Sequence, residues 1–389
     1  MWFNVRLLFR VLYKSLVGTR GTNAQLTLRR ITVLALLAPL YVFVELCNWT
    51  GLLLDRILFP GYRTVKVEKP LFIIGVPRSG TTFLQRLLAR DREQFTSMRF
   101  WEVAFAPSIL QKKMFQMLGR IDALCGSPCA RFIHRFERDQ MAELYRIHRI
   151  GFFEAEEDVW LLFHIFSSAL LVFVFPFAEE LWPYFYPDGE LDKREQQHIM
   201  RFYRECVQRH LYVFGKGRCF LSKNPIFTGM IQCLNRTFPD ARFVCMVRSP
   251  LEVVPSVLSL YQSYSRLFYT PVEFTTINAA ARRVVALYYR YPLEQFSTLP
   301  AERHMVISYP QLMSNLENTV QELYRRFGLS FSPAYEQMVR AEHAKARNYT
   351  SAHRYSLEQF NLSREDIVRE YEDIFDRFGF ERDTERREA

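Results

Sequence analysis

Short apolar runs alternate with helix-like segments along residues 61–389. The runs lie within LFIIGV (71–76), RCFLSKNP (218–225), ARFVCMVRSP (241–250) and ERHMVISYPQL (302–312). Each is followed by a segment in which apolar residues recur with helical spacing. Strands that alternate with helices in this way are typical of a parallel sheet covered by helices on both faces. We therefore expect an α/β fold of three layers with a large helical insertion at about residues 109–214.

Some individual segments carry clearer signals. SREDIVREYEDIFDRFGF is expected to form an amphipathic helix with Ser363 as its N-cap, and the helix in NLENTVQELYRRFGL is expected to stop at Gly328. Residues 95–105 (FTSMRFWEVAF) are expected to be a short extended piece that enters a loop. Residues 160–175 (WLLFHIFSSALLVFVF) are short for a membrane span, so a buried helix is the default interpretation. A lipophilic wall of a binding site or a second membrane contact are the alternatives.

Residues 1–60 follow a different pattern from the rest of the chain. Residues 31–54 form an apolar stretch of 24 residues whose only charge is Glu45, long enough to span a bilayer. The residues before this stretch contain no acid and several bases, namely Arg6, Arg10, Lys14, Arg20, Arg29 and Arg30. We expect residues 1–60 to be a membrane-associating segment, with membrane contact through residues 1–58, and residues 61–389 to be a separate domain.

The topology of the N-terminal segment has three interpretations. A spanning helix places the remainder of the chain across the membrane. An in-plane or re-entrant anchor accommodates Pro39 and Glu45, which a lipid-facing span tolerates poorly. A buried helical subdomain of a soluble protein is the third. Membrane association is the prediction, and the topology stays open.

Composition narrows the classes of partner. The formal net charge of +10 suits an anionic ligand or membrane surface, and no nucleic-acid-binding module accompanies it, so no nucleic-acid partner is expected. The seven cysteines form no CxxC pair and do not fit a zinc site. We expect free thiols, with a bridge between Cys125 and Cys129 left open, and we expect no metal.

The segment LFIIGVPRSGTT (71–82) has the spacing of a phosphate-binding loop. Gly75, Gly80 and Thr82 match GxxxxGK[ST], but Thr81 replaces the lysine and Arg78 lies inside the loop. Backbone N–H groups at such a strand–loop–helix junction form an anion site. Arg248, and no acid, follows the later strand FVCMV. The loop therefore predicts phosphate binding by cations and amides without a metal.

A second anion site is predicted at VRSPLEVVPSVLS. Arg248 leaves the sheet where ligands bind in doubly wound folds, and Ser256 lies eight residues further on, two turns into the next helix. Two separate phosphate sites indicate a nucleotide that carries two separate phosphate groups.

These two motifs resemble those of sulfotransferases, in the bacterial-type and Golgi-type branch that includes tyrosylprotein and carbohydrate sulfotransferases. PRSGTTFLQRLL resembles their 5′-phosphosulfate loop and VRSPLEVVPSVLS their 3′-phosphate motif, and the similarity covers roughly residues 68–375. The resemblance implies a P-loop-like fold and 3′-phosphoadenosine 5′-phosphosulfate (PAPS) as donor. The implied donor-binding residues are Pro77, Arg78, Ser79, Gly80, Thr81, Thr82, Arg248, Ser256, Tyr309 and, in a late loop, Ser351 with His353.

The resemblance also implies catalytic residues. Arg78 and Lys223, in LSKNPIFT, would contact the leaving group or the sulfuryl oxygens. Glu102 falls 24 residues after Arg78, close to the glutamate base of the tyrosylprotein-type enzymes, and flanking Trp101 and Phe105 are expected to raise its pKa. His148 is the rival base. An acidic run is interpreted as a solvated helix start, with substrate binding as the alternative: Glu154, Glu156, Glu157 and Asp158.

Together these features predict sulfuryl transfer to a hydroxyl of a lipophilic or glycan acceptor. The aromatic residues of 152–186 and the N-terminal segment favour a lipid, sterol or glycolipid. The alternatives are a nucleoside-triphosphate-dependent kinase with a degenerate loop and a catalytically silent nucleotide-binding membrane protein. An in-plane anchor predicts a cytoplasm-facing domain and a spanning helix a Golgi-lumenal one. The sequence leaves the oligomeric state open.

Overall fold

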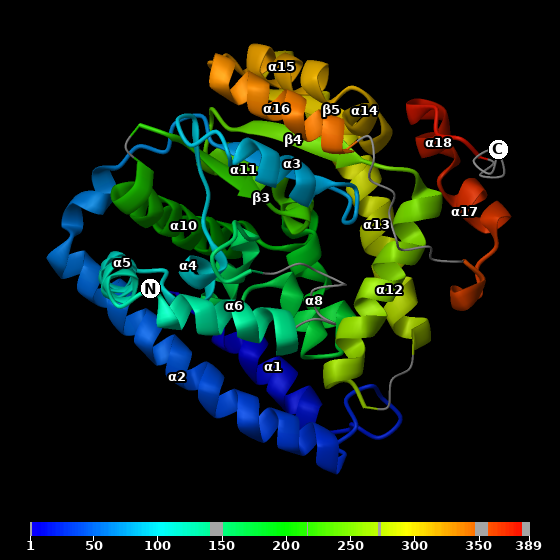
Figure 1. The fold of residues 1–389 in the computed structure, drawn as a ribbon. Coiled ribbons are helices and arrows are strands. Elements are labelled where there is room, and N and C mark those ends of the chain that lie inside the picture. The colour runs from blue at the N-terminus through cyan, green and yellow to red at the C-terminus, as the bar shows by residue number, and fades with distance from the viewer. Residues whose placement is uncertain (1, 141–150, 216, 271–273, 347–356, 383–389) are drawn as a thin grey trace.

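A five-stranded sheet lies at the centre of the protein (Figure 1). The computed structural model describes residues 2–140, 151–215, 217–270, 274–346 and 357–382. The strand order is β2-β3-β1-β4-β5, and every neighbouring pair is parallel. The strands are β1 (Leu71–Gly75), β2 (Phe95–Thr96), β3 (Cys219–Lys223), β4 (Arg242–Val247) and β5 (His304–Ser308). The carboxyl ends of β3, β1 and β4 therefore meet at one edge of the sheet.

Alternate residues of each strand enter different cores, because successive side chains of a strand point to opposite faces. Phe72 and Ile74 join the larger cluster, whereas Leu71 and Ile73 join the smaller. The larger cluster packs under α10 (Lys193–His210), α11 (Ile231–Thr237), α12 (Pro250–Phe268) and α13 (Phe274–Phe296). The smaller packs under α3 (Thr81–Leu88), α14 (Tyr309–Ser314), α15 (Leu316–Phe327) and α16 (Pro333–Ala346). The expected three-layer α/β fold is confirmed.

A large insertion separates β2 from β3, and it is less helical than expected. Its elements are α4 (Phe100–Phe105), α5 (Ile109–Leu124), α6 (Pro128–Gln140), η2 (Asp158–Ile165), η3 (Ala169–Phe173), α8 (Ala178–Phe185), α9 (Pro187–Glu190), α10 and η4 (Leu211–Gly215). Residues 160–175 are buried as predicted, but they form two 3-10 turns and no single α-helix. Phe166 adopts φ 52° between the turns, which ends the first one.

Three further differences concern element boundaries. The stretch 95–105 is extended only at β2, because Arg99 and Glu102 form a capping box that starts α4. The C-terminal helix begins after Ser363 as predicted but divides at Tyr371 into α17 (Arg364–Glu370) and α18 (Glu372–Phe378). The predicted stop at Gly328 is confirmed. The remaining short turns are η1 (Pro60–Thr64), η5 (Pro225–Met230), η6 (Ala301–Arg303) and η7 (Glu358–Phe360).

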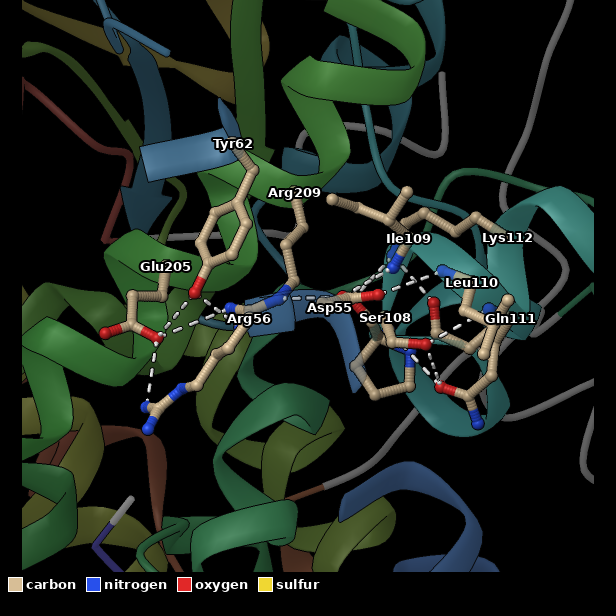
Figure 2. Close-up of polar contacts among 12 residues, drawn as sticks. Asp55, Arg56, Tyr62, Ser108, Ile109, Leu110, Gln111, Lys112, Glu205 and Arg209 are labelled. Atoms are coloured by element: carbon tan, nitrogen blue, oxygen red, sulfur yellow. Dashed lines mark hydrogen bonds and ion pairs between the residues drawn. The ribbon is translucent and has the colours of Figure 1, made fainter. Parts of the chain in front are cut away.

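The N-terminal segment folds into α1 (Val5–Leu16) and α2 (Leu28–Leu58), which lie along one side of the domain (Figure 1). α2 is long and apolar enough to cross a membrane by length and composition. Its C-terminal end is fastened to the domain by Asp55 (Figure 2). The Asp55 carboxylate accepts hydrogen bonds from the backbone N–H groups of Ile109 (2.8 Å) and Leu110 (3.1 Å) and forms an ion pair with Arg209 (3.0 Å). One carboxylate thus joins α2 to the start of α5 and to α10.

The seven cysteines are all free, so Cys125 and Cys129 are not bridged.

Candidate active site

At the end of β1 and in the loop that follows, two positions accept only glycine. Gly75 has φ 117°, and a Cβ there would lie 2.2 Å from the carbonyl oxygen of Met246 on β4. Gly80 has φ 91°, and a Cβ there would lie 2.6 Å from the ring of Tyr309. Arg78 itself adopts φ 66°, a left-handed conformation that is costly for a residue with a Cβ and is frequent at functional sites.

Neighbouring residues hold this loop in place. The Thr228 hydroxyl accepts a hydrogen bond from the backbone N–H of Gly75 (2.8 Å), and the buried Ser79 hydroxyl donates to the carbonyl of Val76 (2.6 Å). The loop leads directly into α3, which begins at Thr81. The positive end of this helix and the preceding amides therefore face the carboxyl edge of the sheet, where an anion can bind.

The two sequence motifs meet in space. The Arg78 Nε donates a hydrogen bond to the Ser256 hydroxyl (3.0 Å), which joins the loop after β1 to α12. The guanidinium of Arg248, at the end of β4, stacks over the ring of Tyr309 at 4.5 Å. Since Tyr309 also packs on Gly80, it lies between the phosphate loop and Arg248.

Arg248 has a fixed backbone and a partly engaged side chain. The Tyr289 hydroxyl donates to its carbonyl oxygen (2.5 Å), and its Nη2 pairs with Glu252. Its Nε is buried and has no hydrogen-bond partner among the described residues. A buried guanidinium nitrogen without an acceptor is the donor that a phosphate oxygen would satisfy.

Lys223 lies at the end of β3, the strand next to β1, and is almost fully buried. Its Nζ forms an ion pair with Glu157 at 2.7 Å. The neighbouring Asp158 fixes this arrangement by accepting hydrogen bonds from Ser222 (2.9 Å) and Asn224 (3.5 Å), the two residues that flank Lys223. The strand end and the start of η2 are thereby held side by side.

Asp158 is also linked to the core. Tyr203 donates a hydrogen bond of 2.5 Å to it from α10. Burial raises the pKa of the Asp158 carboxyl to about 6, although hydrogen bonds from Tyr203, Ser222 and Asn224 oppose the increase. This carboxyl therefore titrates near neutral pH and holds the segment that positions Glu157.

Tyr264 of α12 shows that these charges share one region. Burial raises the pKa of its hydroxyl, the negative charges of Glu157 and Glu156 raise it further, and Arg78 lowers it. Arg78 and Glu157, the carboxylate that pairs with Lys223, thus both affect the pKa of the Tyr264 hydroxyl. We refer to Arg78, Lys223, Glu157 and Tyr264 as the candidate reaction centre.

Glu102 lies in a closed environment. Its carboxylate is 2% exposed and bonds to the Nδ1 of His210 at 2.8 Å. Burial raises the pKa of Glu102, but the charge and hydrogen bond of His210, with the charge of Lys112, outweigh it and hold the pKa below its ordinary value. The expected increase from Trp101 and Phe105 is therefore wrong, because it considered desolvation without an ion-pair partner. The role of Glu102 as a base stays a prediction.

Other sequence-based candidates have different outcomes. His148, Ser351 and His353 lie outside the described residues. The interpretation of the acidic run as a solvated helix start is wrong for Glu156 and Asp158, which are buried. One signal for this burial is present in the sequence: a strongly apolar segment follows the acidic run directly, and charged residues at the start of a buried segment need partners.

Comparison with known proteins decides the family. Residues 70–333 match the sequence profile described as the sulfotransferase family. The chain belongs to the sulfotransferase family. As a sulfotransferase it is an enzyme, and neither the kinase nor the catalytically silent interpretation accounts for this membership.

The similar proteins include mycobacterial sulfotransferases. The omega-hydroxy-beta-dihydromenaquinone-9 sulfotransferases Stf3 of Mycobacterium bovis and Mycobacterium tuberculosis are each 26% identical over 356 residues, which cover 89% of this chain and 85% of the relative. The crystal structure of sulfotransferase STF9 from Mycobacterium avium has a TM-score of 0.68 at 18% identity, covering 83% of this chain and 80% of that one. STF1 from Mycobacterium tuberculosis has a TM-score of 0.66 at 19% identity, with 94% and 91% covered. These two structures show the same fold.

Proposed function

We propose that this sulfotransferase transfers a sulfuryl group from PAPS to a hydroxyl of a lipophilic acceptor. The observation that carries the proposal is the contact between Arg78 and Ser256, which joins two anion-binding motifs in one site. Beside them, the Arg248 guanidinium stacks on Tyr309, which in turn packs on Gly80 of the loop. A nucleotide with phosphates at two positions fits this arrangement.

The residues fit the donor as follows. The amides from Arg78 to Thr82, the hydroxyls of Thr81 and Thr82 and the loop residues Pro77 and Ser79 would surround the 5′ phosphosulfate. Arg248, whose buried Nε lacks an acceptor among the described residues, would hold the 3′ phosphate, with Ser256 beside it. When bound, the donor supplies a sulfuryl group that can be transferred without a metal. Tyr309 would support the nucleotide by packing, and Ser351 stays a predicted contact.

Two cations are placed to stabilise negative charge as it develops. Arg78 is held by Ser256, and Lys223 is held by Glu157. Arg78 follows the carboxyl end of β1, and Lys223 lies at the carboxyl end of the neighbouring strand β3. Preorganised cations in a site from which water is excluded act more strongly than they would in bulk water.

The geometry supports Glu157 as the base that takes the proton of the acceptor hydroxyl. Glu157 is partly exposed and contacts Lys223, whereas the Glu102 carboxylate is enclosed with His210. A base must lie within hydrogen-bond reach of the proton that it removes. In this proposal Glu102 has a positioning role, because its bond to His210 holds α4 against α10. His148 stays a predicted alternative base.

Aromatic side chains beside the candidate reaction centre support a lipophilic acceptor. The ring of Phe173 packs against Tyr264 (4.6 Å between centroids) and Tyr261 (5.2 Å). Behind them is an apolar pocket lined in part by Val172, Trp182 and Tyr261. The mycobacterial relatives are named for a hydroxylated menaquinone, which is itself lipophilic. An apolar wall next to charged catalytic groups suits a molecule with one hydroxyl on a hydrophobic body.

Two measurements on the purified full chain test this proposal. Thermal melting should rise with 3′,5′-diphosphoadenosine and should not rise with ATP–Mg; stabilisation by ATP–Mg alone would overturn the donor assignment. Transfer of ³⁵S from labelled PAPS should appear in lipid extracts. Label found only in oligosaccharides would refute the lipophilic acceptor while leaving the donor assignment in place.

A further inference from the structure

α2 has its polar residues inside and its apolar residues outside, the reverse of an ordinary surface helix. Glu45, Asn48 and Asp55 are buried against the domain. The outward residues are large, apolar and exposed: Leu28, Ile31, Leu36, Leu37, Leu40, Val42, Phe43, Leu46, Leu53, Leu54, Ile57 and Leu58. An exposed apolar stripe of this length is unusual on a protein surrounded by water and marks an interaction surface.

The inner stripe of α2 is bonded to the catalytic domain along its length. Near its start, Arg30 donates to the carbonyl of Phe268 (2.8 Å). At its middle, Glu45 pairs with the buried His164 (2.9 Å). Near its end, Asp55 pairs with Arg209 (Figure 2). From residue 30 to residue 55 a helix extends about 37 Å, since each residue adds ~1.5 Å.

The neighbouring helix α1 presents a second apolar stripe. Val5, Phe9, Leu12 and Leu16 recur at helical spacing and are exposed, while Leu7 and Val11 are buried. α1 lies along the same side of the molecule as α2 (Figure 1), and Phe3, just before α1, packs against Trp49 of α2 (6.2 Å between ring centroids). We call the exposed apolar residues of α1 and α2 the N-terminal apolar face.

The exposed charged residues on α1 and α2 and between them are all basic. The chain contains no acidic residue before Glu45. Five basic residues on or between the two helices are exposed: Arg6, Arg10, Lys14, Arg20 and Arg29, of which Lys14 pairs with Glu180. A helix with an apolar stripe beside basic residues, lying on a folded domain, has the character of an element that binds the surface of an anionic bilayer.

We propose that the N-terminal apolar face docks α1 and α2 flat onto a bilayer that contains anionic phospholipids, with α2 parallel to the membrane plane. This proposal is independent of the sulfuryl-transfer reaction. A spanning α2 would carry its bonded partners with it, so the buried polar groups of His164 and Arg209 would enter the hydrocarbon region. Charged groups at that depth are costly, and the in-plane orientation leaves them on the protein side.

The first test is vesicle binding by the full chain. The wild type should sediment with phosphatidylcholine vesicles that contain phosphatidylglycerol, and less with phosphatidylcholine alone. L40E/F43E should lower binding at least ~10-fold, because each buried Leu or Phe side chain is worth about that factor or more. The control Q311E/N318E adds the same charges at exposed sites elsewhere and should bind like the wild type. Melting temperatures within ~2 °C of the wild type would show that the variants are folded.

Two outcomes of this test would overturn the proposal. One is a wild type that binds neither kind of vesicle. The other is a wild type that is dimeric in buffer, with L40E/F43E abolishing the dimer and leaving vesicle binding unchanged, because the face would then bind a second copy of the chain. Thermal stabilisation by 3′,5′-diphosphoadenosine, measured on the same variants, reports the donor site separately.

The second test is the orientation of α2. Leu28 and Leu58, at its two ends, are exposed and can each be replaced by a cysteine carrying a fluorescent NBD label. The exposed thiols are first removed by C47S/C125S/C129S. Dithionite added outside sealed vesicles should bleach both labels equally if α2 lies in the plane. Protection of one label and not the other would show a spanning helix.

Discussion

Asp55 offers the sharpest test of how the N-terminal segment is attached. Its carboxylate is fully buried, pairs with the buried Arg209 at 3.0 Å and accepts the first two backbone N–H groups of α5 (Figure 2). In D55A the buried Arg209 guanidinium would keep its hydrogen bond to the Tyr62 hydroxyl (2.7 Å) and its ion pair with Glu205 (3.5 Å). Removing one partner of a buried pair costs about 3–5 kcal/mol, and losing a helix cap costs about 1 kcal/mol.

Because Arg209 keeps its contact with Glu205, we take the lower end of the range, about 3 kcal/mol, for loss of the Asp55–Arg209 pair. With about 1 kcal/mol for the lost helix cap, D55A should lower the free energy of unfolding by about 4 kcal/mol. The unfolding entropy of a chain of 389 residues is about 0.8 kcal/mol/K, from ~2.1 cal/mol/K per residue. D55A should therefore lower the melting temperature by about 5 °C. Differential scanning calorimetry measures this shift directly.

A matched control distinguishes this buried pair from an exposed one. Glu317 pairs with Arg340 at 2.8 Å, but the arginine side chain is 57% exposed, so E317A should shift melting by about 1 °C or less. The double variant D55L/R209M should recover much of the loss, since replacing both partners by apolar residues removes the stranded charge. A D55A shift no larger than that of E317A would show that the buried pair with Arg209 contributes no more stability than an exposed one.

Three further predictions concern the site. R248A should weaken the binding of 3′,5′-diphosphoadenosine about 10–100-fold in a calorimetric titration, because a hydrogen bond to a charged group is worth about 1.5–3 kcal/mol. The binding of adenosine 5′-phosphosulfate, which lacks the 3′ phosphate, should be unchanged. E157Q should lower kcat about 10²–10⁴-fold with nucleotide binding retained; an equal loss in E102Q at unchanged melting temperature would favour Glu102 as base. Asp158 has a folded pKa of about 6, above its ordinary 3.8, so its favourable contribution is complete below about pH 4 and is lost as pH rises through 6. From pH 4 to 7 the melting temperature of the wild type should fall by about 3 °C relative to D158N, since about 2.2 pH units (6 minus 3.8) correspond to ~3 kcal/mol and most of this is lost in that window; a constant difference would contradict the raised pKa.

The features that the sequence predicted well are local. Gly75 and Gly80 occupy positions that only glycine fits, so their spacing survives in the sequence as a motif. β1 and β4 are buried on both faces, so their sequences are continuous apolar runs, which are typical of central strands. The positions of Arg248 and Ser256 beside the loop could be predicted because a strand end and the following helix fix them, while donor binding by these residues stays a prediction.

The features that the sequence did not reveal depend on contacts between distant segments. Glu157 meets Lys223 across 66 positions of the chain, and Glu102 meets His210 across 108. Neither pairing leaves a pattern in either segment. The sign of the pKa shift at Glu102 was wrong for this reason, since its neighbours in sequence are apolar and its partner in space is charged. The inverted polarity of α2 is likewise visible only when the domain beneath it is known.

We propose metal-independent sulfuryl transfer from PAPS through Arg78, Lys223 and Glu157. Its most direct test is a transfer assay with ³⁵S-labelled PAPS and lipid extract in excess EDTA, run on the wild type, K223M and the exposed-site control Q311E/N318E. Labelled lipid is expected from the wild type and the control, with a loss of at least ~100-fold in K223M. Transfer that requires Mg²⁺ and ATP, or equal activity in K223M, would contradict this proposal.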